Sequence, residues 1–89
     1  TESIRYGMDD DDTFYFRARC KEELTDYQGA IDDYTLSIEE NRKNPLSYFF
    51  RGEIYYKLNQ KDKACSDWSK AGELGDAEAY DKIKEFCNK

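Results

Sequence analysis

The sequence predicts an all-helical protein, and three observations support this fold class. Among the 89 residues there is no valine and only one proline, whereas Glu and Lys, which are common in helices, are abundant. In the stretch YFFRGEIYYKL, residues 48–58, apolar side chains recur at helical spacing, as Tyr48, Ile54, Tyr55 and Leu58 do. The third observation is an internal repeat in the sequence, with a period of about 34 residues.

The composition limits both the core and the partners of the chain. Leu, Ile and Phe are scarce, so the eight tyrosines and the single tryptophan must provide much of the core. The net charge of −6 disfavours nucleic acid and anionic membrane surfaces. No apolar run approaches the roughly 20 residues of a membrane-spanning helix, and no charged-then-apolar leader is visible. We therefore expect no nucleic-acid binding and no membrane insertion.

The internal repeat is the most specific feature of the sequence. A shift by one period superposes identical residues and close substitutions, such as Ala18 on Gly52 and Tyr34 on Trp68. The identities are Phe16 with Phe50, Arg17 with Arg51, Leu24 with Leu58, Ala30 with Ala64, Asp33 with Asp67, and Glu39 with Glu73.

The period and the residue types resemble the tetratricopeptide repeat (TPR) family, in its bacterial multi-repeat form. The family signature reads Tyr48, Gly52, Tyr55, Ala64, Trp68 and Ala71 in one copy, and Phe14, Ala18, Ala30, Tyr34 and Ser37 in the other. The sequence departs from the family at Lys21, where an aromatic residue is usual, and at Arg17 and Arg51, where a leucine is usual. The resemblance implies an α-solenoid, a right-handed superhelix of antiparallel helix pairs with a C-terminal capping helix.

The elements follow from this repeat in chain order. Residues 1–10 are expected to end the second helix of a preceding repeat, because they fall one period before residues 35–44. Repeat 1 is expected over 11–44, repeat 2 over 45–76, and a capping helix over 77–89, so the chain is predicted to be a C-terminal piece of a longer protein. Helix starts are predicted from Thr25 with Gln28, Asn44 with Pro45, Asn59, and Asp76.

The resemblance also assigns the aromatic rings and the glycine. A small residue such as Gly52 or Ala18 is expected to let Trp68 or Tyr34 approach the first helix of its pair. By the same resemblance Tyr48 and Tyr55 face the partner helix, whereas Phe49, Phe50 and Tyr56 face the concave side.

The sequence offers no catalytic or metal-binding constellation. Histidine is absent, and adjacent carboxylates such as Glu22 and Glu23 diverge on a helix. The acidic run 9–12 is interpreted as the start of a helix, since the glycine and the bidentate glutamate of a calcium loop are missing. We therefore expect no enzyme activity, no metal and no cofactor.

Two charged pairs recur with the repeat. Arg17 precedes Asp33 by the same distance in sequence as Arg51 precedes Asp67. The favoured hypothesis is a salt bridge between the two helices of each repeat, and the alternative is independent solvation of all four side chains.

The three cysteines leave two states open. Cys20 is predicted to be a small core residue. Cys65 and Cys87 lie at similar distances from the predicted turn at Gly75 and are level in an antiparallel pair, so a disulfide is geometrically feasible. The favoured alternative is a pair of packed thiols.

The resemblance implies a non-catalytic scaffold that binds a partner peptide or helix in its concave groove. The expected groove residues are Tyr15, Phe16, Arg19, Glu22, Phe49, Phe50, Glu53, Tyr56 and Lys57. Acidic residues rim these rings, so the ligand is predicted to be an apolar or aromatic segment flanked by Lys or Arg. The alternative function is a structural spacer, or a self-association segment acting through an exposed N-terminal edge. The compartment stays open, with the cytoplasm slightly favoured.

Overall fold

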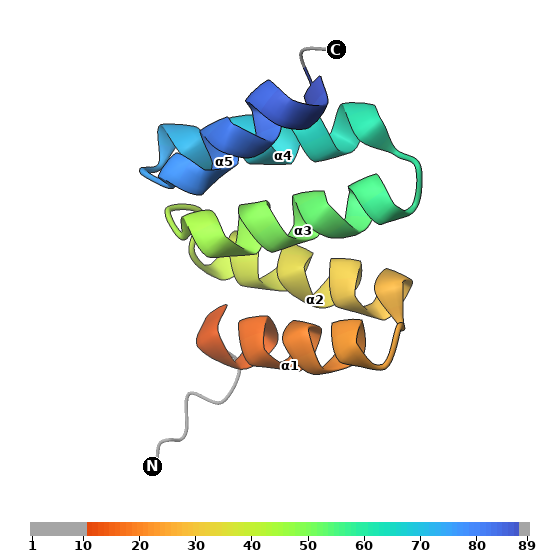
Figure 1. The fold of residues 1–89 in the computed structure, drawn as a ribbon. Helices are drawn as coiled ribbons and strands as arrows, with labels where there is room; N and C mark the ends of the chain where they lie inside the picture. The colour runs from red at the N-terminus through yellow and green to blue at the C-terminus, as the bar shows by residue number, and fades with distance from the viewer. Residues whose placement is uncertain (1–10, 88–89) are drawn as a thin grey trace. The chain divides into compact units, whose positions relative to one another are not determined.

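The computed structural model describes residues 11–87, with the side chains of 13–87, and this part of the chain is helical with no strand. Its helices are α1 (Asp11–Glu23), α2 (Tyr27–Glu40), α3 (Pro45–Lys57), α4 (Lys61–Glu73) and α5 (Ala77–Lys82). A five-residue π-helical segment, η1 (Ile83–Cys87), continues α5 (Figure 1). The all-helical prediction is confirmed for this range. The expected helix end over 1–10 lies outside the described residues.

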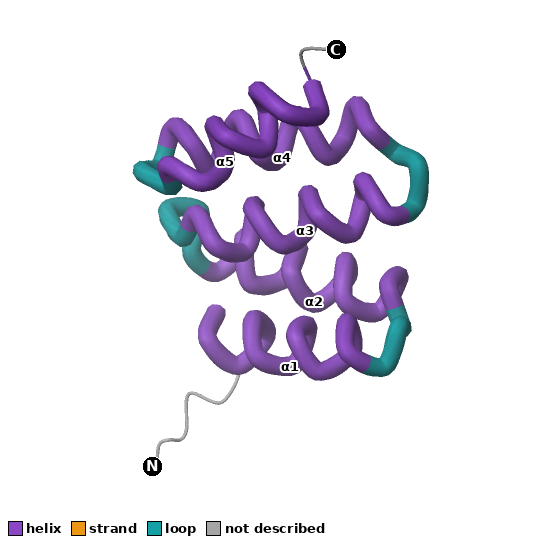
Figure 2. Tube along the Cα trace, viewed as in Figure 1, coloured by secondary structure: helices purple, strands orange, loops and turns teal. Residues whose placement is uncertain are grey.

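The chain divides into two compact units, one ending at Arg42 and the other beginning at Lys43. In the first unit α1 and α2 run antiparallel, side by side, joined by a short turn (Figure 2). Its fully buried side chains include Ala18, Ala30 and Tyr34, whose spacing on each helix places them on one face. Burial of these side chains accounts for the helical spacing seen in the sequence.

The second unit contains the antiparallel pair α3 and α4, with α5 and η1 packed on α4. Trp68 fills its centre at 1% exposure, and the indole Nε1 donates a hydrogen bond of 3.2 Å to the backbone oxygen of Phe49. A Cβ atom on Gly52 would lie 2.9 Å from that Nε1 and 3.1 Å from the Ala64 backbone oxygen. The prediction that Gly52 admits Trp68 is therefore confirmed.

Three turns between helices share one geometry, in which a single residue adopts a positive φ angle. These residues are Thr25 (φ 59°), Asn59 (φ 63°) and Gly75 (φ 111°). In each turn the next residue donates its backbone N–H to the carbonyl five positions earlier, which closes a Schellman motif at the helix end. The sequence repeat therefore extends to the geometry of the first two turns.

This geometry corrects two of the predicted helix starts. Thr25 and Asn59 end the preceding helices, so the N-caps of α2 and α4 are Asp26 and Gln60. The Asp26 side chain accepts from the Gly29 N–H, whereas Gln60 makes no side-chain capping bond. The predicted caps Asn44 and Asp76 are confirmed, since their side chains accept from Leu46 and Glu78.

Two further expectations need correction. Cys20 is exposed, so it is not a core residue. The predicted capping helix is regular only to Lys82, where it widens into the π-helical η1. Within residues 11–87, every helix is too short or too polar to cross a membrane.

Candidate functional site

Each helix pair is joined by a bidentate ion pair. In the first unit Arg17 donates from Nε and Nη2 to the two carboxylate oxygens of Asp33, at 3.0 and 2.9 Å. In the second, Arg51 donates to Asp67 through the same atoms at 2.7 and 2.8 Å. The predicted salt bridges are confirmed, and they are more buried than an ordinary surface pair because both carboxylates are buried.

The two repeated carboxylates differ in their surroundings. Burial acts to raise the pKa of Asp33, but hydrogen bonds from Arg17 and Lys21 outweigh it and the pKa lies below its ordinary value. Burial of Asp67 raises its pKa, and the bonds from Arg51 offset only part of that effect. Asp33 and Asp67 are equivalent positions in the repeat, but their pKa values are shifted in opposite directions. Asp33 has a second cation beside it, Lys21, whereas Asp67 pairs with Arg51.

The arginines also lie against aromatic rings, which holds the guanidinium planes in place. The Arg17 guanidinium is 5.2 Å from the Phe14 ring centroid, and that of Arg51 is 5.8 Å from both Tyr48 and Tyr55. Each ion pair thus links the two helices of its own pair.

A cysteine pair joins the C-terminal segment to α4. Cys65 and Cys87 form a disulfide with Cα atoms 6.0 Å apart, so the structure contains the bridge rather than the two packed thiols. The bridge ties η1 directly to the middle of α4.

A small cleft lies in the second unit where α3, α4 and the C-terminal segment meet. Its volume is about 140 Å³, and its lining residues are Glu53, Tyr56, Lys57, Trp68, Lys82 and Phe86. The Phe86 ring is 4.7 Å from that of Tyr56 and 5.9 Å from that of Trp68. Lys82 forms an ion pair of 3.2 Å with Glu53 across the cleft, and its Nζ lies 5.5 Å from the Phe86 centroid. We refer to these six residues as the aromatic cleft.

The aromatic cleft brings together three of the predicted groove residues, namely Glu53, Tyr56 and Lys57. Phe49 is 6% exposed and contacts Phe50 edge to face at 5.3 Å. The Tyr56 ring is 38% exposed and also packs against that of Trp68 on the partner helix at 5.8 Å.

The other predicted groove residues belong to the first unit. The Tyr15 ring contacts Phe16 at 5.4 Å and Tyr34 at 6.0 Å. Arg19 forms an ion pair of 3.7 Å with Glu22, which also accepts a hydrogen bond of 3.4 Å from the Tyr34 hydroxyl. Burial raises the pKa of that hydroxyl, and the neighbouring Glu22 carboxylate adds to the effect. Phe16 is 63% exposed, so it is the ring of this group that offers most surface to a ligand.

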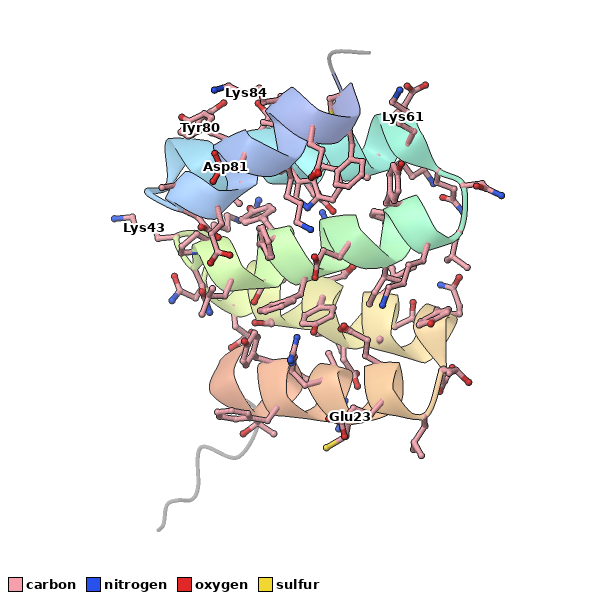
Figure 3. The ribbon with its side chains drawn as sticks, viewed as in Figure 1. Glu23, Lys43, Lys61, Tyr80, Asp81 and Lys84 are labelled. Carbon is pink, nitrogen blue, oxygen red and sulfur yellow. A yellow bond between two sulfur atoms is a disulfide. The ribbon has the colours of Figure 1, made fainter. Side chains whose placement is uncertain are left out.

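Sequence reasoning missed the contribution of Phe86 and Lys82 to a site. Both were assigned to a helix that merely covers the end of the protein. The available signal was their i, i+4 spacing, which places a cation and a ring on one face of the segment. Figure 3 shows Tyr80 and Lys84 on the exposed surface of the same segment.

The site has the chemistry of a binding surface. The part of the chain with described coordinates holds no group of three or more His, Cys, Asp or Glu side chains that could bind a metal. The aromatic cleft combines ring faces with one ion pair at its mouth, an arrangement that can accept an apolar side chain beside a charge.

The fold and the site define an all-helical protein whose helix pairs repeat one ion pair. No family model matches the chain. Over 48 residues, 54% of its length, it is 48% identical to dynein axonemal assembly factor 4 of Rattus norvegicus. The same protein of Mus musculus and of Pan troglodytes is 46% identical over 48 residues.

The match covers 11% of the length of each of these relatives. All three are mammalian proteins, so they lend no support to the expected bacterial form of the family. They are proteins that part of this chain is similar to, and the similarity does not extend to their whole length.

Proposed function

We propose that this chain is a non-catalytic protein-interaction segment of the TPR type, which binds a peptide or helix of a partner protein. The observation that carries the proposal is the recurrence of the bidentate Arg–Asp bridge one repeat period later, at the same place in each helix pair. Each repeat keeps the same internal bridge, and each has a small residue opposite a large ring. Structural repeats of this kind stack on their neighbours in solenoid proteins. In this proposal the pairs stack into a right-handed solenoid.

Partner binding is supported by the distribution of aromatic surface. Phe16 is 63% exposed and Tyr56 is 38% exposed, and Tyr56 also lines the aromatic cleft. Exposed rings with restricted side-chain freedom are common anchors in protein interfaces. The proposed ligand is an apolar or aromatic segment flanked by Lys or Arg, because the chain carries a net charge of −6.

The similarity to proteins named as dynein axonemal assembly factors adds support of another kind. An assembly factor acts on proteins, and a protein partner is what this proposal requires. The similarity names no residue of this chain as a contact.

The experiment uses Trp68, the single tryptophan, as a fluorescent reporter of the aromatic cleft. The chain, kept in dithiothreitol, is titrated with four short synthetic peptides of equal length that place a central Phe or Ser between flanks of Lys or of Glu. We expect saturable binding of the Phe peptide with Lys flanks and weak binding of the other three. The matched control is Tyr80→Ala, which removes an exposed ring outside the cleft.

Two results would count against the proposal. Equal binding of the Phe and Ser peptides would show that charge alone drives association. Concentration-dependent sedimentation of the chain without peptide, together with no peptide binding, would favour the self-association alternative.

A further inference from the structure

Two of the six residues of the aromatic cleft, Lys82 and Phe86, come from the C-terminal segment and pack on the other four as a ligand would. Phe86 lies on the rings of Tyr56 and Trp68, and Lys82, four residues earlier, pairs with Glu53. The cation at position i thus pairs with a carboxylate on α3, and the ring at position i+4 packs on rings of α3 and α4. This is the chemistry that an external helix would need in order to bind there.

This segment buries few of its residues against the helix pair. None of the five residues of η1 is buried, and Ala79 is the one buried residue of α5. Helical segments of this length are marginal in water without tertiary support. The Lys82–Glu53 ion pair is partly exposed, so it adds little.

The disulfide is the strongest link between the segment and the helix pair. It joins Cys87, the residue directly after Phe86, to Cys65 on α4, across a separation of 22 residues. By restricting this loop it keeps Phe86 close to Trp68. Both cysteine residues are half-buried, and thiol–disulfide exchange requires an attacking thiolate to reach one of their sulfur atoms.

We propose that the Cys65–Cys87 disulfide is a redox-controlled clasp, and that its reduction frees Glu53, Tyr56 and Trp68, the α3 and α4 side of the aromatic cleft, for a partner helix with a Lys or Arg four residues before a Phe. A dithiol attacks the disulfide through a mixed disulfide, and then its second thiol completes the exchange. The S–S bond of the protein breaks, two cysteine thiols form, and the dithiol is oxidised to its own disulfide. The protein gains two electrons and two protons from the dithiol.

Release of η1 changes what the cleft offers. In the oxidised state the Phe86 ring covers Tyr56 and Trp68, and the Lys82 ammonium forms an ion pair with the Glu53 carboxylate. In the reduced state a partner helix can replace Phe86 and Lys82, since it presents a ring and a cation at the same spacing. The ligand part of this inference rests on the proposed function, whereas the release of η1 does not.

The first test measures release in the full chain. Hydrogen exchange of the amides of residues 77–87 is compared with and without dithiothreitol, and alkylation with mass spectrometry counts the thiols. We expect one alkylated cysteine in the oxidised chain, three in the reduced chain, and at least tenfold faster exchange after reduction. Cys20→Ser should respond to dithiothreitol as the wild type does, while Cys65→Ser should exchange rapidly under both conditions.

The second test measures docking with a defined probe. A labelled peptide of residues 77–87, carrying serine in place of Cys87, is titrated into the chain in each redox state. We expect the reduced chain and the Cys65→Ser variant to bind it at least tenfold more tightly than the oxidised chain. The matched control peptides replace Phe86 or Lys82 by alanine and should lose that difference.

The outcomes separate the two parts of the inference. Equal exchange of residues 77–87 in both redox states overturns the clasp, whatever the peptide does. Fast exchange without peptide binding overturns docking at this cleft and counts against the proposed function there. Circular dichroism of Cys65→Ser shows whether the helices are retained, and the dithiothreitol comparison on the wild type needs no variant.

Discussion

Arg51 donates two hydrogen bonds to Asp67, of 2.7 and 2.8 Å, and so joins α3 to α4. The Arg17–Asp33 pair joins α1 to α2 through the same atoms, one repeat period earlier in the chain. The arginine of the second pair is 17% exposed, against 49% for that of the first. This contrast sets the first prediction.

Double-mutant cycles should reveal coupling in both pairs, and more in the second. We expect a coupling free energy of about 2 kcal/mol for Arg51→Gln with Asp67→Asn, because a bidentate bond to a charged group is shielded there from solvent. For Arg17→Gln with Asp33→Asn we expect about 1 kcal/mol, because water screens the half-exposed guanidinium. Urea unfolding of the four single and two double variants measures both values. Additive single effects in both pairs would contradict the prediction.

The pKa values of the two carboxyl groups should be shifted in opposite directions from the ordinary value of 3.8, downward for Asp33 and upward for Asp67. Burial acts to raise the pKa of Asp33, but Arg17 and Lys21 lower it overall, so the unfolded state binds the proton more readily. Asp33 therefore stabilises the fold above about pH 4, and this contribution is lost as the pH falls toward its folded pKa. The raised pKa of Asp67 has the opposite sign, with stability lost as the pH rises through that value.

Carboxyl-detected NMR titration of the folded chain measures both pKa values directly. Asp33→Asn should also flatten the loss of stability as the pH falls below about 4, because the folded pKa of Asp33 lies below its ordinary value. A folded pKa of Asp33 at or above that of Asp67 would refute this assignment.

Gly52→Ala should destabilise the second unit although alanine is the better helix former. The gain in helix propensity is about 1 kcal/mol, whereas the new methyl group would meet the Trp68 indole and the Ala64 backbone oxygen. Overpacking of this kind costs about 1 to 3 kcal/mol, so we expect a net loss of about 1 kcal/mol in urea unfolding.

The chain offers a matched rescue for this variant. Its first unit has Ala18 and Tyr34 at the repeat-equivalent positions, so Gly52→Ala combined with Trp68→Tyr reproduces that pair. We expect the double variant to be more stable than the sum of the two single effects predicts. Purely additive effects would mean that the methyl group and the indole do not compete for space.

Thr25→Asn should stabilise the chain by about 0.5 to 1 kcal/mol, because a β-branched residue is strained at positive φ. Thr25 has a φ of 59°, and its repeat equivalent Asn59 has nearly the same value. The bond from Thr25 Oγ1 to the Leu24 oxygen is exposed, so losing it costs little. The reciprocal variant Asn59→Thr should be destabilised by a similar amount, as measured by thermal unfolding. A stabilised Asn59→Thr would run against the strain argument.

Phe49→Ala should affect mainly the stability of the fold, whereas Phe16→Ala should affect mainly ligand binding. Phe49 is 6% exposed, so Phe49→Ala should destabilise the chain by about 3 kcal/mol. Phe16 is 63% exposed, so Phe16→Ala should change stability by less than about 0.5 kcal/mol. Under the proposed function it should weaken ligand binding, and melting temperature with peptide titration checks both effects. A large drop in melting temperature for Phe16→Ala would make that ring part of the core.

The sequence by itself determined the helical class and some of the contacts within each helix pair. The repeat period was enough to predict the Arg17–Asp33 and Arg51–Asp67 bridges, and the small residue at Gly52 opposite Trp68. These contacts join residues at fixed offsets on two antiparallel helices joined by a short turn, and such offsets are visible in a linear sequence.

Only the tertiary structure decided which rings are covered and how the turns close. Tyr56 packs on Phe86 and Trp68, and Cys65 reaches Cys87, because α5 and η1 run back along α4 after the turn at Gly75. Thr25 resembled an N-cap in sequence, but the preceding helix ends on it in a left-handed conformation. Exposure and backbone strain depend on what surrounds a residue in space. A sequence period records which positions are equivalent, and equivalent positions can have different surroundings.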